Sequence, residues 1–157
     1  MVDGQFEAVG SDVSAVRRAI ATAAKIPKAA IELAASAADA GHLSVHVRVS
    51  LTSAVAVREQ TDVVVALTQD RLTNDVPRGE NRGLRLAHSA VVRSLTALGS
   101  FQPPARTFEK TVPVPVAADW EVHNVRIIGL LQERRSRRIV GAGSVRVDES
   151  EGSPSVR

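Results

Sequence analysis

The stretch His42–Thr52, HLSVHVRVSLT, indicates the fold more strongly than any other part of this sequence. Apolar and polar residues alternate along it, with Leu43, Val45, Val47, Val49 and Leu51 on one face and His42, Ser44, His46, Arg48 and Ser50 on the other. Because successive side chains of a β-strand point to opposite faces, this alternation predicts a strand that is buried on one side only. The β-branched valines favour the same structure.

Similar aliphatic runs recur on both sides of this stretch. They predict strands at 29–36, 54–59, 62–68, 125–132 and 138–147, with a compact charged turn, ERRSRR, between the last two. The segment 111–116, TVPVPV, contains two prolines and fits an edge strand or an extended connection better than a central strand. Short strands at this spacing predict a mainly β protein, an antiparallel β-sandwich.

Three other stretches are less regular. Residues 86–98, LAHSAVVRSLTAL, fit helix and strand patterns about equally well, and both remain open. Residues 69–83 and 101–107 read as irregular connections, and connections of about 15 residues are often functional. The alternating charges of the first connection are expected to pin it through ion pairs and turn hydrogen bonds, with Asn81 in a left-handed turn position.

The chain opens with a hairpin signal, Asp3-Gly4, before a first strand has had room to form. Ser11 or Asp12 can cap a helix that runs to about Ala24. Such a hairpin and helix are too small to bury their own apolar faces. We therefore divide the chain into a hairpin-plus-helix piece at 1–27, a β-sandwich domain at 28–148 and a disordered tail at 149–157.

The composition is that of one globular domain. The chain has 157 residues, of which 44% are hydrophobic and 24% charged. Aromatic residues make up only 3%, so the core must be built from aliphatic residues and alanine. The calculated pI is about 10.2, but the net charge is only +3 and the basic residues are spread along the chain. We therefore expect no nucleic-acid partner.

The residues present also limit the chemistry. The absence of cysteine excludes disulfides, a thiol nucleophile and cysteine-ligated zinc in this chain. No apolar run approaches the roughly 20 residues of a membrane-spanning helix, and no leader pattern is visible, so a chain made as it stands is expected in the cytoplasm. His42 and His46 share a face of the predicted strand but would lie about 13 Å apart, too far to share a zinc ion. We expect no metal and no cofactor.

No catalytic motif is visible. His88 and His123 are single histidines between apolar positions, a setting that usually satisfies the ring with a local partner. No serine lies in a G-x-S-x-G elbow, and nothing local supports a Ser–His–Asp triad. Gly79 and Gly83 resemble part of a phosphate loop but lack the G-K-[ST] ending. We therefore expect that the chain is not an enzyme.

One longer sequence pattern resembles that of a known protein family. The segment 79–93, G-E-N-x-G-x-x-L-x-H-x-x-V-V-R, resembles the signature of an uncharacterised family of exported bacterial proteins, a secreted domain of unknown function that follows a thioredoxin-like domain. The segments 125–145, VRIIGLLQERRSRRIVGAGSV, and 2–12, VDGQFEAVGSD, are similar to that family's closing hairpin and last thioredoxin hairpin. The resemblance covers nearly the whole chain.

This resemblance implies that residues 1–27 are the C-terminal remnant of a thioredoxin-like domain. The redox Cys-x-x-Cys and the signal peptide of the family would then lie upstream, in a parent protein that is periplasmic or secreted. None of the family's redox residues maps onto this chain. Whether the chain is a fragment or a genuine short form remains open, as does its oligomeric state.

Three functions follow as hypotheses. The first is a non-catalytic accessory or interaction domain with a protein partner, the second is part of a thiol-disulfide oxidoreductase whose redox half is supplied elsewhere, and the third is a hydrolase using His88. The candidate functional residues are those of the signature: Gly79, Glu80, Asn81, Gly83, His88 and Arg93. In a functional loop Glu80 and Asn81 would shape the tip, and His88 and Arg93 would anchor it from the adjacent element. A structural role for all of them is the simpler interpretation.

Overall fold

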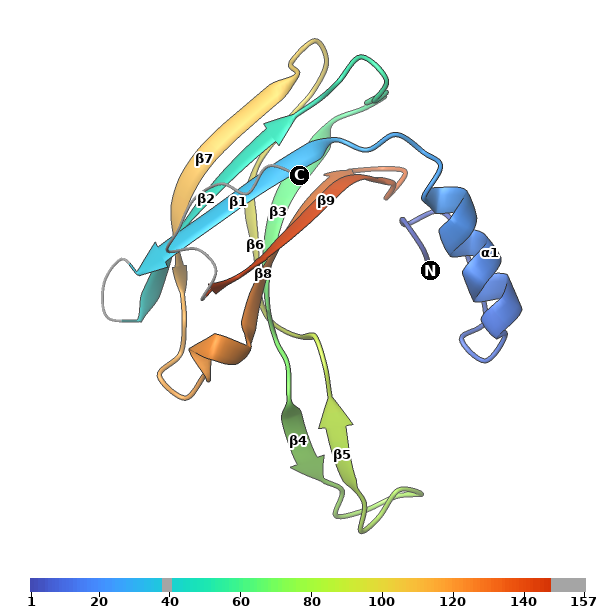
Figure 1. Cartoon of the computed structure of the whole chain (residues 1–157), viewed down its shortest axis with the longest axis vertical. Coiled ribbons are helices and arrows are strands. Elements are labelled where there is room, and N and C mark those ends of the chain that lie inside the picture. Colours follow the sequence, from blue (N-terminus) through green and yellow to red (C-terminus); the bar gives the residue numbers. More distant parts are fainter. Residues whose placement is uncertain (38–40, 148–157) are drawn as a thin grey trace.

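The computed structural model describes residues 1–37 and 41–147, and its body consists of two facing antiparallel sheets (Figure 1). The strand order of the smaller sheet is β1-β2-β7 and that of the larger is β6-β3-β8-β9. The strands are β1 (Ala30–Ala37), β2 (His42–Ser50), β3 (Thr61–Gln69), β6 (Val91–Phe101), β7 (Thr107–Pro115), β8 (Val125–Glu133) and β9 (Ile139–Arg146). This architecture confirms the predicted β-sandwich. The tail predicted at 149–157 lies outside the described residues.

The core lies between the sheets and is aliphatic, as the composition predicts. The alternation of His42–Thr52 is realised in β2, where Val45, Val47 and Val49 are fully buried. They face Val63 and Val65 of β3 across the sandwich in one continuous cluster. Burial of each such side chain contributes about 1.5–3 kcal/mol, so this seam supplies much of the free energy of folding.

Contacts between the two sheets also close the edges of the sandwich. At one edge Ala29 forms a parallel bridge with Gly141, where a Cβ on Gly141 would lie 2.9 Å from the Ala29 carbonyl oxygen. At the other edge the rings of Phe101 and Phe108 stack with their centroids 6.5 Å apart. Glycine on β9 therefore allows a backbone approach that a larger residue would block.

Two predictions about strands meet different outcomes. The proline-containing segment, expected to be an edge strand or an extended connection, is an edge strand, because β7 pairs only with β2 in the smaller sheet. The strand predicted at 54–59 is wrong, since this segment is a turn-containing connection. Its apolar alternation reflects the burial of Val55, while its backbone bonds to side chains: the Arg58 N–H donates to Glu133 and the Ala56 carbonyl accepts from Arg138.

Residues 86–98, for which the sequence fits helix and strand equally well, are extended. The polar connection at 69–83 contains regular structure as well. β4 (Leu72–Asp75) and β5 (Arg85–His88) pair as a two-stranded ribbon that we call the arm, residues 72–88. The arm projects away from the sandwich (Figure 1). The prediction of an irregular 69–83 is therefore wrong in part, because hydrogen bonding within the arm replaces contacts with the body.

The first residues form the predicted hairpin and helix. Asp3 and Gly4 both have positive φ, 51° and 68°, as a tight hairpin turn requires, although only one bridge, Val2 to Phe6, joins its two sides. The helix α1 (Val13–Ala23) begins at Asp12, whose carboxylate accepts from the Ala15 N–H. This N–H is the main cause of the lowered pKa of Asp12.

The helix α1 stands apart from both sheets (Figure 1). Of its residues only Ala23 is buried, while Val13 and Ile20 are 58% and 52% exposed. A short 3-10 turn, η1 (Val122–Asn124), leads into β8. Within the described part of the chain, no helix is long and apolar enough to cross a membrane.

Candidate functional site

The signature that the sequence singled out runs along the arm into β6. Residues 76–84 form its tip, where the Gly83 N–H donates to the Val76 carbonyl and the Arg82 N–H donates to the Gly79 carbonyl. Gly79 and Gly83 have φ of 90° and 83°, so these glycines supply the left-handed positions. Asn81 is not among the residues of positive φ, and the prediction that it adopts a left-handed turn is wrong.

The charges of this segment do not pin it as expected. None of the charged residues between 70 and 82 belongs to an ion pair in the described part of the chain. The contacts present are hydrogen bonds, such as that from the Ala90 N–H to Asp70 Oδ1 at 2.7 Å. The tip keeps its shape through its own backbone, and the charges of Arg78, Glu80 and Arg82 face solvent.

His88 lies at the body end of the arm, opposite Leu72. Its Nε2 is 2.5 Å from Asn74 Oδ1, and the side chain is exposed. A general base needs a nucleophile within hydrogen-bond reach. Among the described residues, Asn74 is the side chain that contacts this ring, and an amide can orient a histidine but not act as a nucleophile.

Arg93 belongs to the sandwich and not to the arm. Its guanidinium lies 4.9 Å from the ring centroid of Trp120 and 3.9 Å from an Asp119 carboxylate oxygen. The geometry is that of a cation–π contact, which fastens β6 to the segment before η1. The structure therefore distributes the six signature residues along one ribbon and its base and does not gather them into one pocket.

The remaining histidines do not form a metal centre. His42 is exposed, and the Nδ1 of half-buried His46 is 3.0 Å from Thr111 Oγ1. His123 is the middle residue of η1, and its Nε2 lies 3.8 Å from a Glu121 carboxylate oxygen. Over residues 1–37 and 41–147, no group of three or more metal-ligating side chains is present.

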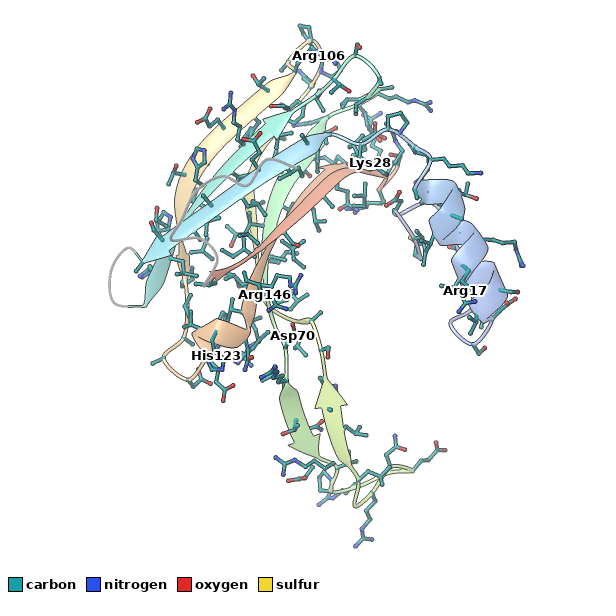
Figure 2. The ribbon with its side chains drawn as sticks, in the orientation of Figure 1. Arg17, Lys28, Asp70, Arg106, His123 and Arg146 are labelled. Carbon is teal, nitrogen blue, oxygen red and sulfur yellow. The ribbon has the colours of Figure 1, made fainter. Side chains whose placement is uncertain are left out.

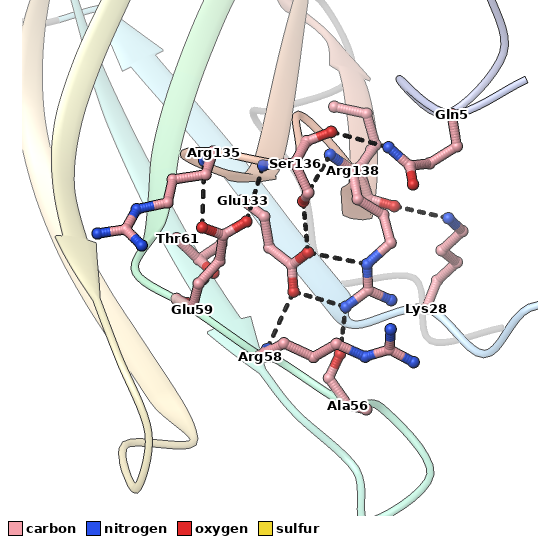
Figure 3. Close-up of polar contacts among 11 residues, drawn as sticks. Gln5, Lys28, Ala56, Arg58, Glu59, Thr61, Glu133, Arg135, Ser136 and Arg138 are labelled. Carbon is pink, nitrogen blue, oxygen red and sulfur yellow. Dashed lines mark hydrogen bonds and ion pairs between the residues drawn. The ribbon is translucent and has the colours of Figure 1, made fainter. Parts of the chain in front are cut away.

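The most strongly perturbed acid lies elsewhere, at the β8–β9 turn (Figure 3). Glu133 is 2% exposed and accepts four hydrogen bonds, from two guanidinium N–H groups of Arg138, the Ser136 hydroxyl and the Arg58 N–H. Hydrogen bonds from Arg138 are the largest cause of its pKa, which is lowered from 4.5 to about 2. Sequence patterns gave no sign of this pair.

This polar cluster also fastens the N-terminal hairpin. The Ile139 N–H donates to the Asp3 carbonyl at 2.9 Å, and Lys28 Nζ bridges Asp3 Oδ2 at 2.5 Å and the Ile139 carbonyl at 2.6 Å. Nearby, Glu59 accepts from the Ser136 N–H, the main cause of its lowered pKa. Because every oxygen of Glu133 is occupied, the cluster is structural and not a site poised for proton transfer.

A polar cavity of about 190 Å³ lies at the base of the arm and was missed by sequence reasoning. Its lining includes Asp70, Arg71, His123, Arg126 and Arg146. Three of these labelled in Figure 2, Asp70, His123 and Arg146, lie together where the arm leaves the sandwich. In sequence the five are spread over more than 70 positions, so no local motif could have revealed them.

The outer face of the larger sheet carries a row of apolar side chains. In its central row Ala66 of β3 lies between Leu95 of β6 and Ile128 of β8. Leu95 is 66% exposed and Val92, further along β6, is 58% exposed. An apolar stripe on the solvent side of a sheet is typical of surfaces that other protein elements cover.

Comparison with known proteins assigns the sequence of this chain to a family. Residues 1–132 match the model of the family described as "Protein of unknown function (DUF1223)". The chain belongs to this family. The match joins the N-terminal hairpin, α1 and most of the sandwich in one family pattern, while the search of curated proteins found no match.

Two solved structures share the fold. HBP35 of Porphyromonas gingivalis superposes with a TM-score of 0.67 at 11% identity, over 96% of this chain and 53% of that one. A domain of the outer membrane lipoprotein Omp28 from the same organism gives a TM-score of 0.54 at 15% identity, over 78% of this chain and 89% of that one. The chain thus spans about half the length of the HBP35 structure. At these identities the likeness concerns the fold alone.

Proposed function

We propose that this chain is a non-catalytic interaction domain of an exported thioredoxin-like protein. The observation that carries the proposal is the uncovered apolar side of α1, with Val13 58% and Ile20 52% exposed. An amphipathic helix normally buries its apolar stripe. A thioredoxin-like domain that ends in this hairpin and helix would supply the missing cover.

Two further observations support the proposal. The chain aligns with about half of the HBP35 structure, so a protein of this fold can be built with a second part of similar size. The outer face of the larger sheet exposes Val92 and Leu95, which provides an apolar surface for a neighbouring domain. Export of the parent follows from the resemblance of the signature segment 79–93 and its flanking hairpins to exported proteins.

The genomic DNA directly upstream of the Met1 codon tests the origin of the chain. We expect an uninterrupted reading frame that encodes a signal peptide and a Cys-x-x-Cys motif. An in-frame stop close upstream, with a ribosome-binding site, would contradict the thioredoxin-like parent.

The interaction role is tested on the arm. In the parent protein, replacing Arg78, Glu80 and Arg82 by alanine is expected to weaken capture of the protein partner while leaving the melting temperature unchanged, because these side chains are exposed. Replacement of Arg48, exposed on β2 of the smaller sheet, serves as the control for nonspecific loss of charge. A lower melting temperature with unchanged capture would show that the tip is only structural.

The proposed lack of hydrolase activity is tested at His88. We expect no hydrolysis of simple esters or glycans that depends on His88, since its side-chain partner among the described residues is Asn74. Activity of the purified chain that is lost in His88→Ala but retained in His42→Ala would overturn it.

A further inference from the structure

Three arginines meet at the base of the arm from separate parts of the chain. Arg71 follows β3, Arg126 begins the outward-facing row of β8, and Arg146 ends β9. All three line the cavity of about 190 Å³, together with Asp70, His123 and Asn124. Figure 2 shows that Arg146, Asp70 and His123 lie on the same side of the molecule, beside the root of the arm.

Strand register explains why they meet. Arg126 is directly opposite Thr68 of β3 on one side and Arg146 of β9 on the other. Directly opposed residues of antiparallel strands project from the same face, about 4.5–5.5 Å apart at Cβ. Two arginines in this position repel each other, so their pairing costs stability unless a negative charge lies between them.

Among the residues that the structure describes, the lining of the cavity holds more positive than negative charge. Within residues 1–37 and 41–147, the guanidinium groups of Arg71, Arg126 and Arg146 form no ion pair and no hydrogen bond. The Arg126 carbonyl accepts from the Thr68 hydroxyl. One oxygen of Asp70, the carboxylate of the lining, accepts from the Ala90 N–H at 2.7 Å. The neighbouring Glu121 is 2.6 Å from Asn124 Nδ2 and 3.8 Å from His123 Nε2. Three arginines and one aspartate therefore line the cavity.

We propose that this cavity binds a phosphate group. Guanidinium forks donate paired N–H groups that match the oxygens of a tetrahedral oxyanion. A phosphate carries about two negative charges at neutral pH, which balances the lining of three arginines and one aspartate. The group comes either as free inorganic phosphate or as the phosphate of a small monoester. This site goes beyond the proposed interaction role, which uses the tip of the arm, α1 and the outer face of the sheet.

Calorimetric titration of the full chain with inorganic phosphate and with glycerol phosphate tests the proposal. The reference titration uses sodium chloride at the same ionic strength. We expect saturable binding of phosphate that chloride does not reproduce. Arg126→Gln and Arg146→Gln are each expected to weaken it about tenfold or more, because each removes a charge-assisted hydrogen-bond donor. Arg17→Gln, a change of an exposed arginine on α1, is expected to leave the affinity unaltered.

The same titrations distinguish free inorganic phosphate from a phosphate monoester as the bound molecule. Tighter binding of glycerol phosphate shows that the site takes a monoester, and equal or weaker binding shows that it takes the free anion. No saturable binding to the wild-type chain, or an equal loss in Arg17→Gln, overturns the proposal. Circular dichroism checks folding. Because Arg126→Gln relieves repulsion, it should melt no lower than wild type, and Arg126→Lys, which keeps the charge but lacks the fork, should still weaken binding.

Discussion

Replacing Glu133 by glutamine keeps the shape of the side chain and removes its charge. In the folded protein this carboxylate is buried beside Arg138, which itself is only 17% exposed. Its pKa is lowered from an ordinary 4.5 to about 2. The difference of about 2.5 corresponds to about 3 kcal/mol of folding free energy at about 1.4 kcal/mol per pH unit. Removal of one partner from a buried ion pair costs a similar amount, about 3–5 kcal/mol.

The stabilising effect of the Glu133 carboxylate depends on pH. A carboxyl group whose pKa is lowered by folding stabilises the protein above its unfolded pKa, here 4.5, and the stabilisation is lost as the pH falls towards 2. We expect Glu133→Gln to lower the free energy of unfolding by about 3 kcal/mol at pH 7. The deficit should shrink steadily between pH 4.5 and pH 2.

Urea unfolding of both proteins at a series of pH values measures this difference. Subtracting the two curves removes the contributions of the carboxylates outside this cluster, which both proteins share. Glu59→Gln is the matched control, because Glu59 belongs to the same cluster but is half-buried and accepts from the Arg135 and Ser136 N–H groups, with no ion pair among the described residues. If the wild-type and Glu133→Gln curves run parallel from pH 7 to pH 2, the assignment of the low pKa to this pair is refuted.

Three further changes test other parts of the structure. Gly4→Ala should release the N-terminal hairpin, because a Cβ there would collide with the Arg137 carbonyl. Hydrogen exchange at the Ile139 amide, which donates to Asp3, should then accelerate. Gly10→Ala is the control and should leave the exchange rate unchanged, because a Cβ at Gly10 meets no other atom. Arg93→Leu should cost about 0.5–1 kcal/mol and alter the emission of Trp120, the one tryptophan of the chain; an emission spectrum unchanged from wild type would count against the cation–π contact. Replacing residues 72–88 with a short glycine–serine linker should barely change the urea midpoint, because the arm adds no side chain to the buried core; a loss of more than about 2 kcal/mol would show that the arm supports the sandwich.

Local pattern was informative wherever one face of a strand is buried in the sandwich. The valines of β2 alternate because they line the core, so their period could be read without a structure. The same alternation predicted a strand wrongly at 54–59, where two valines are covered by the sandwich although the backbone has no strand partner. Burial alone produced the same alternation there. At Asn81 residue preference pointed to a left-handed position that the turn instead assigns to neighbouring glycines.

The fold class, the non-central place of the proline-containing segment, the capped helix and the family resemblance could all be predicted from local patterns. These depend on residues that are close along the chain. Folding alone brings together the Glu133–Arg138 pair, with the N-terminal hairpin held beside it, and the three arginines at the base of the arm. Cross-strand register and loop packing set such meetings. They are long-range properties of the fold, so no stretch of residues 71–146 carries them alone.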